Sequence, residues 1–403
     1  MKTSFWNAGH KPTLLSAFLY FDLSFMVWVL LGPLAVQISA DLHLSPAQKG
    51  LMVATPVLSG ALLRVVMGVL VDHLQPKKAG IIGQIIVLLS LFTAWMVGVH
   101  SYQHALLLGV FLGFAGAAFA VALPLASRWY PPEHQGTALG IAGAGNSGTA
   151  LAALFAPGLA MAYGWNNVFG LALIPLLVAL VVYLIFAKDS PETPAAKSLQ
   201  QYLAVLKDKD AWWFMFFYSV TFGGFVGMAS SLSIYFHDQY GLSPVVAGYF
   251  TAACVFAGSL VRPLGGNMAD RIGGIRTLSL MYALAATFLF ILSFGLKLPL
   301  VGLAVVVAAM LSLGMGNGAV FQLVPQRFRK EIGVMTGLVG MAGGIGGFYL
   351  ASSLGFSKQV TGSYQLGLLI FSLLALVAMA GLSKVKTRWR TTWGSATMTS
   401  AKV

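Results

Sequence analysis

The chain has 403 residues, of which 58% are hydrophobic and only 9% are charged, and its mean hydropathy is +0.83. A soluble core does not use that much apolar surface, so the composition excludes an ordinary soluble domain and indicates a polytopic membrane protein. The single cysteine, Cys254, excludes an intrachain disulfide. The 46 glycines fit a bundle of closely packed helices.

Twelve apolar stretches are long enough to span a bilayer. We expect spanning helices over residues 13–38, 47–71, 79–98, 104–127, 137–162, 166–187, 211–236, 245–268, 277–296, 300–324, 332–356 and 365–384. The longest polar interval, 188–210, is the expected linker between an N-terminal six-helix half, 1–187, and a C-terminal half, 211–403. Within the linker, we expect Gln200–Leu206 to form a short helix at the membrane surface.

The basic residues predict the orientation. If both termini lie on one side, 19 of the 24 Lys and Arg residues fall on that side, and only Lys49, Lys297 and Lys358 fall on the other. This bias places both termini and the linker in the cytoplasm, with the chain in the cytoplasmic (inner) membrane. The net charge of +13 is therefore a topology signal, and no nucleic-acid-binding motif accompanies it.

Two arginines remain, and they lie within apolar stretches in the same local pattern. The first copy reads Leu44-Ser-Pro-x-x-x-Gly50, then Gly60-x-x-x-Arg64-x-x-x-Gly68-x-x-x-Asp72, and the second repeats it 198 residues later, from Leu242 through Arg262 to Asp270. The repeat indicates a tandem duplication with one buried cation in each half. Because a charge at bilayer depth is costly, both are functional-site candidates, and two related cations between halves predict an anion site.

Twelve spans in two related sixes are the plan of a secondary transporter. Gly68-x-x-x-Asp72-His73-x-x-Pro76-Lys77-Lys78 and Gly266-x-x-x-Asp270-Arg271-x-Gly273-Gly274-x-Arg276 resemble the loop motif of the major facilitator superfamily. The first copy departs from the motif at His73 and Pro76. The resemblance implies an all-α membrane fold of twelve helices in two pseudo-symmetric halves, and a gating role for Gly68, Asp72, Gly266, Asp270 and Arg271. The alternative interpretation is helix capping combined with the charge bias.

Arginine suits an oxyanion, since its flat, permanently charged guanidinium offers paired donors to two oxygens. The alternative is a structural ion pair with a buried carboxylate. The only acid well inside a predicted helix is Asp22, so two arginines and one acid leave a cavity with net positive charge. This balance favours an anionic substrate.

Two glycine-rich segments occupy corresponding places in the halves, Gly140-x-x-Gly143-Ala-Gly145-Asn146-Ser-Gly148 and Gly337-x-x-Gly340-x-x-Gly343-Gly344-x-Gly346-Gly347. Close helix packing is one interpretation. With Arg64 and Arg262 they also resemble the paired signatures of the nitrate/nitrite porter family, over essentially the whole chain. That resemblance implies a substrate-binding set of Arg64, Arg262, Asn146, Tyr218, Phe222, Phe119, Phe321, Phe25, Gly143, Gly145, Gly340 and Gly343. The aromatic members are otherwise explained by packing.

Nitrate suits such a site because it is flat and singly charged, so guanidinium groups can bond its edges while rings cover its faces. Nitrite should also fit, with fewer contacts, whereas a narrow slot disfavours tetrahedral sulfate and phosphate. No cofactor or metal is expected. The expected partners are nitrate, nitrite, protons and the lipid bilayer, and the transporter is expected to work as a monomer.

The guanidinium groups do not release protons, which leaves two coupling mechanisms. One is exchange of nitrate for nitrite, and the other is symport with protons, because nitrate import opposes an inside-negative potential. Each charge moved against 100 mV costs about 2.3 kcal/mol, so at least two protons per nitrate would make import net electrogenic inward. Asp22 lies well inside the first helix, where it is either a proton carrier or a counter-ion for an arginine. Exchanging members of the family typically lack an acid there, so the resemblance indicates the assimilatory branch. We therefore expect proton-coupled uptake, with exchange as the alternative.

Three other functions are less well supported. A non-transporting anion sensor would need a signalling domain or a long tail, and the linker and tails are short. An organic-phosphate exchanger would need histidine or lysine near the midplane, whereas the seven histidines lie near the membrane faces. An enzyme is not expected, because no metal cluster, nucleophile arrangement or phosphate-binding loop appears.

Overall fold

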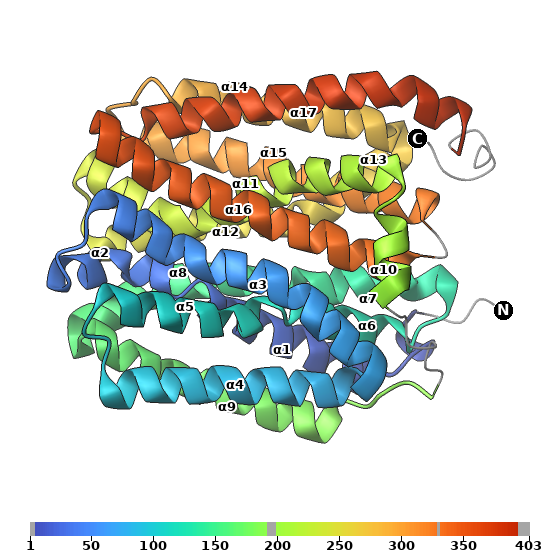
Figure 1. Cartoon of the computed structure of the whole chain (residues 1–403), viewed down its shortest axis with the longest axis horizontal. Coiled ribbons are helices and arrows are strands. Elements are labelled where there is room, and N and C mark those ends of the chain that lie inside the picture. The colour runs from blue at the N-terminus through green and yellow to red at the C-terminus, as the bar shows by residue number, and fades with distance from the viewer. Residues whose placement is uncertain (1–4, 192–198, 329–330, 394–403) are drawn as a thin grey trace.

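The computed structural model describes residues 5–191, 199–328 and 331–393, and over these ranges the chain is helical with short connections (Figure 1). The helices are α1 (Lys11–Trp28), α2 (Leu31–Asp41), α3 (Pro46–Leu74), α4 (Pro76–Val97), α5 (Tyr102–Gly116), α6 (Phe119–Ser127), α7 (Pro132–Gly143), α8 (Gly148–Tyr163), α9 (Trp165–Phe186), α10 (Leu199–Val205), α11 (Lys209–Tyr240), α12 (Pro244–Leu260), α13 (Arg262–Ile272), α14 (Gly274–Leu292), α15 (Pro299–Arg327), α16 (Ile332–Thr361) and α17 (Gln365–Thr391). Two 3-10 turns, η1 (Phe5–Asn7) and η2 (Ala144–Ser147), complete them.

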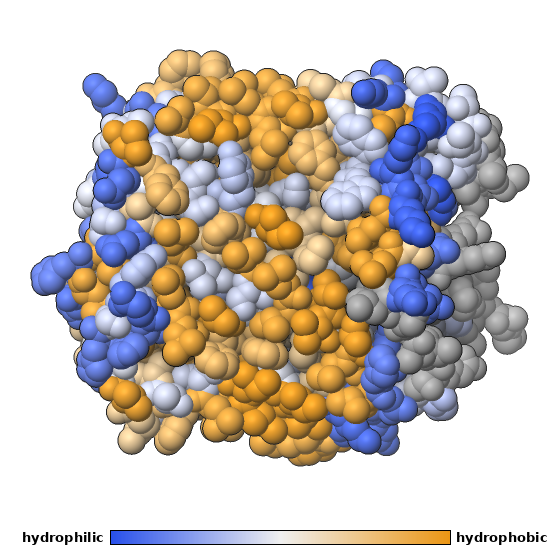
Figure 2. Space-filling view, in the orientation of Figure 1, coloured by the Kyte–Doolittle hydropathy of each residue, from blue (hydrophilic) through white to orange (hydrophobic). Residues whose placement is uncertain are grey.

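Twelve segments of the described chain are long and apolar enough to cross a membrane, which confirms the predicted number. Four of them are interrupted, between α1 and α2, α5 and α6, α7 and α8, and α12 and α13. In Figure 2 an apolar band separates two hydrophilic ends, as expected for a protein that spans a bilayer. The protein is therefore a multi-pass membrane protein with the predicted all-α fold.

Several helix boundaries differ from the prediction by a few residues, and the end of α17 differs most. The last helix, α17, continues to Thr391 instead of ending at residue 384, because Trp389 on its basic extension is fully buried and stacks on Phe214 at 4.6 Å. The seventh span begins at Lys209, two residues earlier than expected. Helix α10 confirms the short helix predicted within the linker.

The repeat seen in the sequence is also a repeat of local structure. The side chains of Ser45 and Ser243 cap α3 and α12, and a proline follows each of them at the start of the helix. One turn later the two glycines of the repeat approach the opposite half. A Cβ added to Gly50 would lie 2.8 Å from Gly355, and one added to Gly248 would lie 2.9 Å from Pro157. Gly355 and Pro157 are themselves 198 residues apart, so these contacts are symmetric.

Further contacts join the halves at the end of the molecule opposite the termini. The Lys49 ammonium lies 3.6 Å from the Asp238 carboxylate, which also accepts a hydrogen bond of 2.6 Å from the Tyr364 hydroxyl. The backbone N–H of Ala47 donates to the Gln359 side chain at 3.3 Å. Both labelled termini lie at the other end of the bundle (Figure 1).

Toward the end that holds the termini, the glycine-rich segments have open space beside them. A Cβ added to Gly140, Gly143 or Gly337 would meet no atom within 4 Å. Further along the same segment as Gly337, one added to Gly346 would lie 2.0 Å from a backbone oxygen of α11. These contacts between the halves thus lie at the end opposite the termini, while glycines toward the other end have open space beside them.

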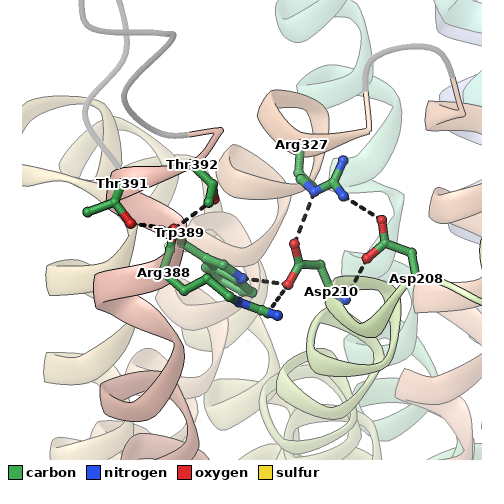
Figure 3. A network of polar contacts seen from close by, with 7 residues as sticks. All are labelled: Asp208, Asp210, Arg327, Arg388, Trp389, Thr391 and Thr392. Carbon is green, nitrogen blue, oxygen red and sulfur yellow. Dashed lines mark hydrogen bonds and ion pairs between the residues drawn. The ribbon is translucent and has the colours of Figure 1, made fainter.

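At the end that holds the termini, a polar network fixes the C-terminal half (Figure 3). Asp210, near the start of α11, accepts hydrogen bonds from Arg327 at 3.0 Å, from the Trp389 indole at 2.7 Å and from Arg388. Arg327 also pairs with Asp208 at 2.5 Å. The network joins the start of α11 to the ends of α15 and α17.

Candidate anion site

Arg64 lies midway along α3 and is almost completely buried, with 1% of its surface exposed. Its Nε donates to the Gly116 carbonyl at 3.2 Å, and its Nη1 donates to the Gly340 carbonyl at 2.6 Å. Gly116 belongs to the N-terminal half and Gly340 to the C-terminal half, so one side chain connects the two. Its Nη2 is buried and has no hydrogen-bond partner among the described residues.

The Gly116 carbonyl is available because the fourth span is interrupted directly after it. The N–H of Ala120 bonds to the carbonyl of Ala117 instead, so the helical ladder does not use Gly116 in the usual way. The break also places Phe119 at the first position of α6, with its ring 5.0 Å from the Arg64 guanidinium carbon.

Aromatic rings surround the Arg64 guanidinium. Besides Phe119, the rings of Phe222, Trp28 and Phe25 lie 5.2, 5.4 and 6.0 Å from its central carbon. Such contacts stabilise a desolvated cation. The cation is thus held by backbone carbonyls and ring faces, without a carboxylate among the described residues.

Arg262 has a different environment, although it occupies the matching position of the repeat. It is the first residue of α13, directly after the break in the eighth span, and its side chain is partly buried. Its Nη2 donates to the Tyr218 hydroxyl at 3.2 Å, and its guanidinium lies 5.4 Å from the ring of Phe321. Its Nη1 is buried without a partner in the described part of the chain.

A stacked ring pair on α11 links the two arginines. Tyr218 and Phe222 are parallel, with ring centroids 5.0 Å apart, and Phe321 meets Tyr218 edge-on at 5.0 Å. Tyr218 contacts Arg262 through its hydroxyl, while Phe222 faces Arg64. Both cations therefore lie against one aromatic wall, each with an unused donor.

Gly343 on α16 allows this wall to pack closely. A Cβ at Gly343 would lie 2.7 Å from Tyr218 and 2.8 Å from Phe222, which is closer than real contacts allow. At Gly340 an added Cβ would make ordinary contacts, at 3.4 Å from Arg64 and 3.5 Å from Phe119. Gly340 contributes to the site mainly through its carbonyl.

A second cluster forms where α1 crosses η2. Asp22, 8% exposed, accepts a hydrogen bond of 2.8 Å from the Ser147 hydroxyl. Gly145 packs against this stretch, since a Cβ there would lie 3.0 Å from the Asp22 nitrogen. Neither arginine forms an ion pair with Asp22 in the described structure, so the geometry does not support the counter-ion interpretation. The side-chain oxygen of Asn146 is buried without a partner among the described residues.

The two copies of the loop motif are used differently. Asp72 pairs with Arg128 at the end of α6, at 3.4 Å, and Gly68 lies one turn before it on α3. In the second copy Asp270 and Arg271 are exposed, and a Cβ at Gly266 would have only one neighbour, at 3.9 Å.

The structure thus brings most of the predicted binding set together. Around the arginines it gathers Tyr218, Phe222, Phe119, Phe321, Phe25, Gly340 and Gly343. Asn146 and Gly145 belong to the cluster around Asp22, and Gly143 faces open space. The sequence analysis missed Trp28, Gly116 and Ser147. Trp28 follows Phe25 by three residues and so shares its helix face, which is a signal that was available.

The chemistry of the site is that of anion binding. Its unpartnered groups among the described residues are one guanidinium N–H donor on each arginine, and the Tyr218 hydroxyl lies beside them. Among the described residues no group of three or more His, Cys, Asp or Glu side chains is arranged to hold a metal ion.

Comparison with known proteins places this chain in a family. The family model described as Major Facilitator Superfamily matches residues 16–351. A protein of Bacillus subtilis (strain 168) named "Nitrite extrusion protein" is 35% identical to the chain, covering 88% of it and 89% of the relative. A protein of Mycobacterium tuberculosis (strain CDC 1551 / Oshkosh) named "Probable nitrate/nitrite transporter NarK2" is 34% identical, covering 88% and 91%.

A solved structure shares the fold. It is a bacterial homologue of the human lysosomal transporter Spinster, described as inward-facing and occupied, and it matches with a TM-score of 0.69 over 94% of this chain and 98% of the other. The identity of 18% supports the fold alone.

Proposed function

This chain belongs to the nitrate/nitrite porter family of the major facilitator superfamily, and on that premise we propose that it carries nitrate, and nitrite with fewer contacts, across the cytoplasmic membrane. Family membership makes it a transporter, not an enzyme. Transport proceeds by alternating access, with the anion bound between Arg64 and Arg262.

One observation carries the choice of an anion. Arg64 Nη2 and Arg262 Nη1 are both buried, and neither has a hydrogen-bond partner among the described residues. A buried cationic N–H without an acceptor is costly, and here two of them come from opposite halves along one aromatic wall. An anion that accepts from both removes that cost and joins the halves.

The shape of the surroundings favours a planar anion. The rings of Phe119, Phe222 and Phe321 lie within 5.4 Å of a guanidinium carbon. Flat donors and ring faces match an ion whose oxygens lie in one plane. Nitrate presents three such oxygens and nitrite two, whereas tetrahedral sulfate does not fit between ring faces.

Asn146, Gly143 and Gly145 contribute in another conformation of the cycle. Gly143 has open space beside it, and Gly145 and Asn146 lie in the cluster around Asp22, away from the guanidinium groups. The Asn146 carboxamide oxygen has no partner among the described residues. We assign them to contacts that form when the open end closes over the anion.

Two bodies perform the cycle, residues 1–187 and 211–403, joined by the linker 188–210. The charge bias places the termini and this linker in the cytoplasm, so the packed end faces outward and the open end inward. The motif residues Gly68, Asp72, Gly266, Asp270 and Arg271 lie at the cytoplasmic end. We assign them to control of opening at the cytoplasmic end. In this structure the Asp72–Arg128 ion pair is formed.

Asp22 is the candidate for proton coupling. Its carboxylate bonds to Ser147 and is not neutralised by either arginine, so it is available to take up and release a proton. Because each charge moved against 100 mV costs about 2.3 kcal/mol, at least two protons per nitrate make the import step net electrogenic inward.

Exchange of nitrate for nitrite is the second candidate. The specific observation in its favour is the Arg64–Gly340 hydrogen bond of 2.6 Å, which joins the two halves. If this bond opens only when an anion takes its place, the halves reorient only with an anion bound, which is the behaviour of an exchanger.

Nitrate uptake into proteoliposomes without internal nitrite, with and without an inward proton gradient, separates the two. Accumulation driven by the gradient establishes symport, and uptake only into vesicles loaded with nitrite or nitrate establishes exchange. No nitrate flux under either condition would refute the proposed function.

Asp22→Asn then tests the proton site. We expect gradient-driven accumulation to be lost while exchange continues, because the amide does not carry the proton but leaves the arginines in place. Exchange by the same variant is the internal control for folding. Unchanged accumulation would make Asp22 structural.

A further inference from the structure

Trp28, at the end of α1, lies beneath the Arg64 guanidinium and is fully buried. Its ring centroid is 5.4 Å from the guanidinium carbon. Its indole N–H donates to the Pro56 carbonyl at 2.7 Å. Pro56, Gly60 and Arg64 follow one another at four-residue intervals, so they share one face of α3. The indole is thus anchored to the face that carries the arginine.

Two glycines form the slot that admits the indole. A Cβ at Gly60 would lie 2.7 Å from Trp28 Nε1, and one at Gly116 would lie 2.3 Å from the same atom. Gly116 is also the residue whose carbonyl accepts from Arg64 Nε. The slot, the indole and the arginine therefore form one packed unit.

We propose that Trp28 is a positioning residue that holds the Arg64 guanidinium in the orientation that leaves Nη2 available to the anion. The indole fills the space toward Gly60, so the arginine side chain has no room to withdraw along α3. The Gly116 and Gly340 carbonyls fix two of its nitrogens, and the ring faces fix its plane. This inference rests on the proposed function.

Among the described residues of the C-terminal half there is no counterpart of Trp28. The residue 198 positions after Trp28 is Val226, and the glycine matching Gly60 is Gly258, where a Cβ would meet Phe225 at 2.9 Å. Within the described ranges no tryptophan lies over Arg262, whose ring contact is Phe321. The Arg64 guanidinium is therefore held in one orientation, whereas the Arg262 guanidinium has fewer contacts that fix it.

The consequence is a change in anion selectivity when the indole is removed. Nitrate needs both guanidinium groups near one plane, whereas nitrite, with two oxygens, depends less on a fixed Arg64. Trp28→Leu removes the ring face and the N–H, and Trp28→Phe keeps a ring face in the same slot.

The test measures nitrate and nitrite dissociation constants by calorimetry on the purified full-length protein. We expect Trp28→Leu to weaken nitrate binding about 10-fold, the size of a desolvated cation–π contact, and to weaken nitrite binding less. Trp28→Phe should recover part of the nitrate affinity. A merely structural role would lower the fraction of active protein without changing the nitrate-to-nitrite ratio.

Trp95→Leu is the matched control. Trp95 also packs on a glycine, Gly170, and donates its indole N–H to Asn167 at 3.0 Å, but it contacts neither arginine. We expect its nitrate-to-nitrite ratio to equal that of the wild type.

Three results would overturn the proposal. If the wild type does not bind nitrate, the proposed function falls and the inference with it. If the wild type binds nitrate and Trp28→Leu keeps the same ratio, only the role of Trp28 falls. If Trp28→Leu does not fold, Trp28→Phe decides, and an unchanged ratio in that variant refutes the positioning role.

Discussion

Arg64 and Arg262 occupy equivalent positions of one repeat, yet the two halves hold them differently. Arg64 is 1% exposed, donates to two backbone carbonyls and lies among four aromatic rings. Arg262 is partly buried, donates to one hydroxyl and faces one ring. The difference shows that a repeated motif fixes the residue type and depth, while the neighbouring helices decide how firmly the residue is held.

The symmetry is kept at one end of the molecule and lost at the depth of the arginines. Gly50 and Gly248 make matching contacts with the opposite half. Arg64 also reaches across, to Gly340, whose counterpart 198 residues earlier is Ala142. Arg262 does not make the matching contact and bonds instead to Tyr218 of its own half. A carrier that alternates between two states needs this inequality, because a fully symmetric one would hold both sets of contacts at once.

Replacing each arginine by lysine tests the comparison most strongly. Arg64→Lys should weaken nitrate binding about 1,000-fold, because the bonds to the Gly116 and Gly340 carbonyls that orient Nη2 toward the anion, about 2 kcal/mol each, are lost. Arg262→Lys should weaken it about 30-fold, since an ammonium still reaches the Tyr218 hydroxyl and only the paired geometry is lost. Equilibrium binding of nitrate to the purified variants measures both. Equal losses of affinity would show that the two arginines contribute equally. Wild-type affinity in both variants would refute binding of the anion between Arg64 and Arg262.

The second prediction compares the buried polar network at the start of α11 with the exposed acid of the second loop motif. Asp210 is buried and accepts from Arg327, Arg388 and Trp389, so Asp210→Asn should lower stability by about 3 kcal/mol, as expected for a broken buried ion pair. Asp270 in the second motif is exposed and has no ion pair within the described ranges, so Asp270→Asn should leave the melting temperature unchanged. Thermal unfolding in detergent compares them. A larger loss in Asp270→Asn would contradict the role given to the network in Figure 3.

The third and smallest effect concerns the aromatic wall that the arginines share. Gly343→Ala places a methyl group 2.7 Å from Tyr218 and 2.8 Å from Phe222, so the stack must shift, and nitrate affinity should fall about 10-fold, or about 1.4 kcal/mol. Gly337→Ala, two turns away on the same helix, meets no atom within 4 Å and should bind like the wild type. Titration of the two purified variants with nitrate measures both affinities. Identical affinities would show that the position of the stack does not matter for binding.

The sequence by itself determined the class of protein, the number of spans and the repeat. Hydrophobic length is a local property, so twelve spans follow from counting. The expense of a charge in lipid likewise singles out Arg64 and Arg262 without a structure. The family resemblance then supplied Tyr218 and Phe222, which the structure places beside them.

The tertiary structure alone decided which of these residues meet. The break after Gly116 frees a carbonyl for Arg64, and the slot between Gly60 and Gly116 admits Trp28, but neither follows from helical periodicity. Asp22 proved to bond to Ser147 instead of an arginine, because the crossing of α1 and η2 sets its partner. Contacts between segments far apart in sequence depend on how the helices pack, so a pattern within one segment does not specify them.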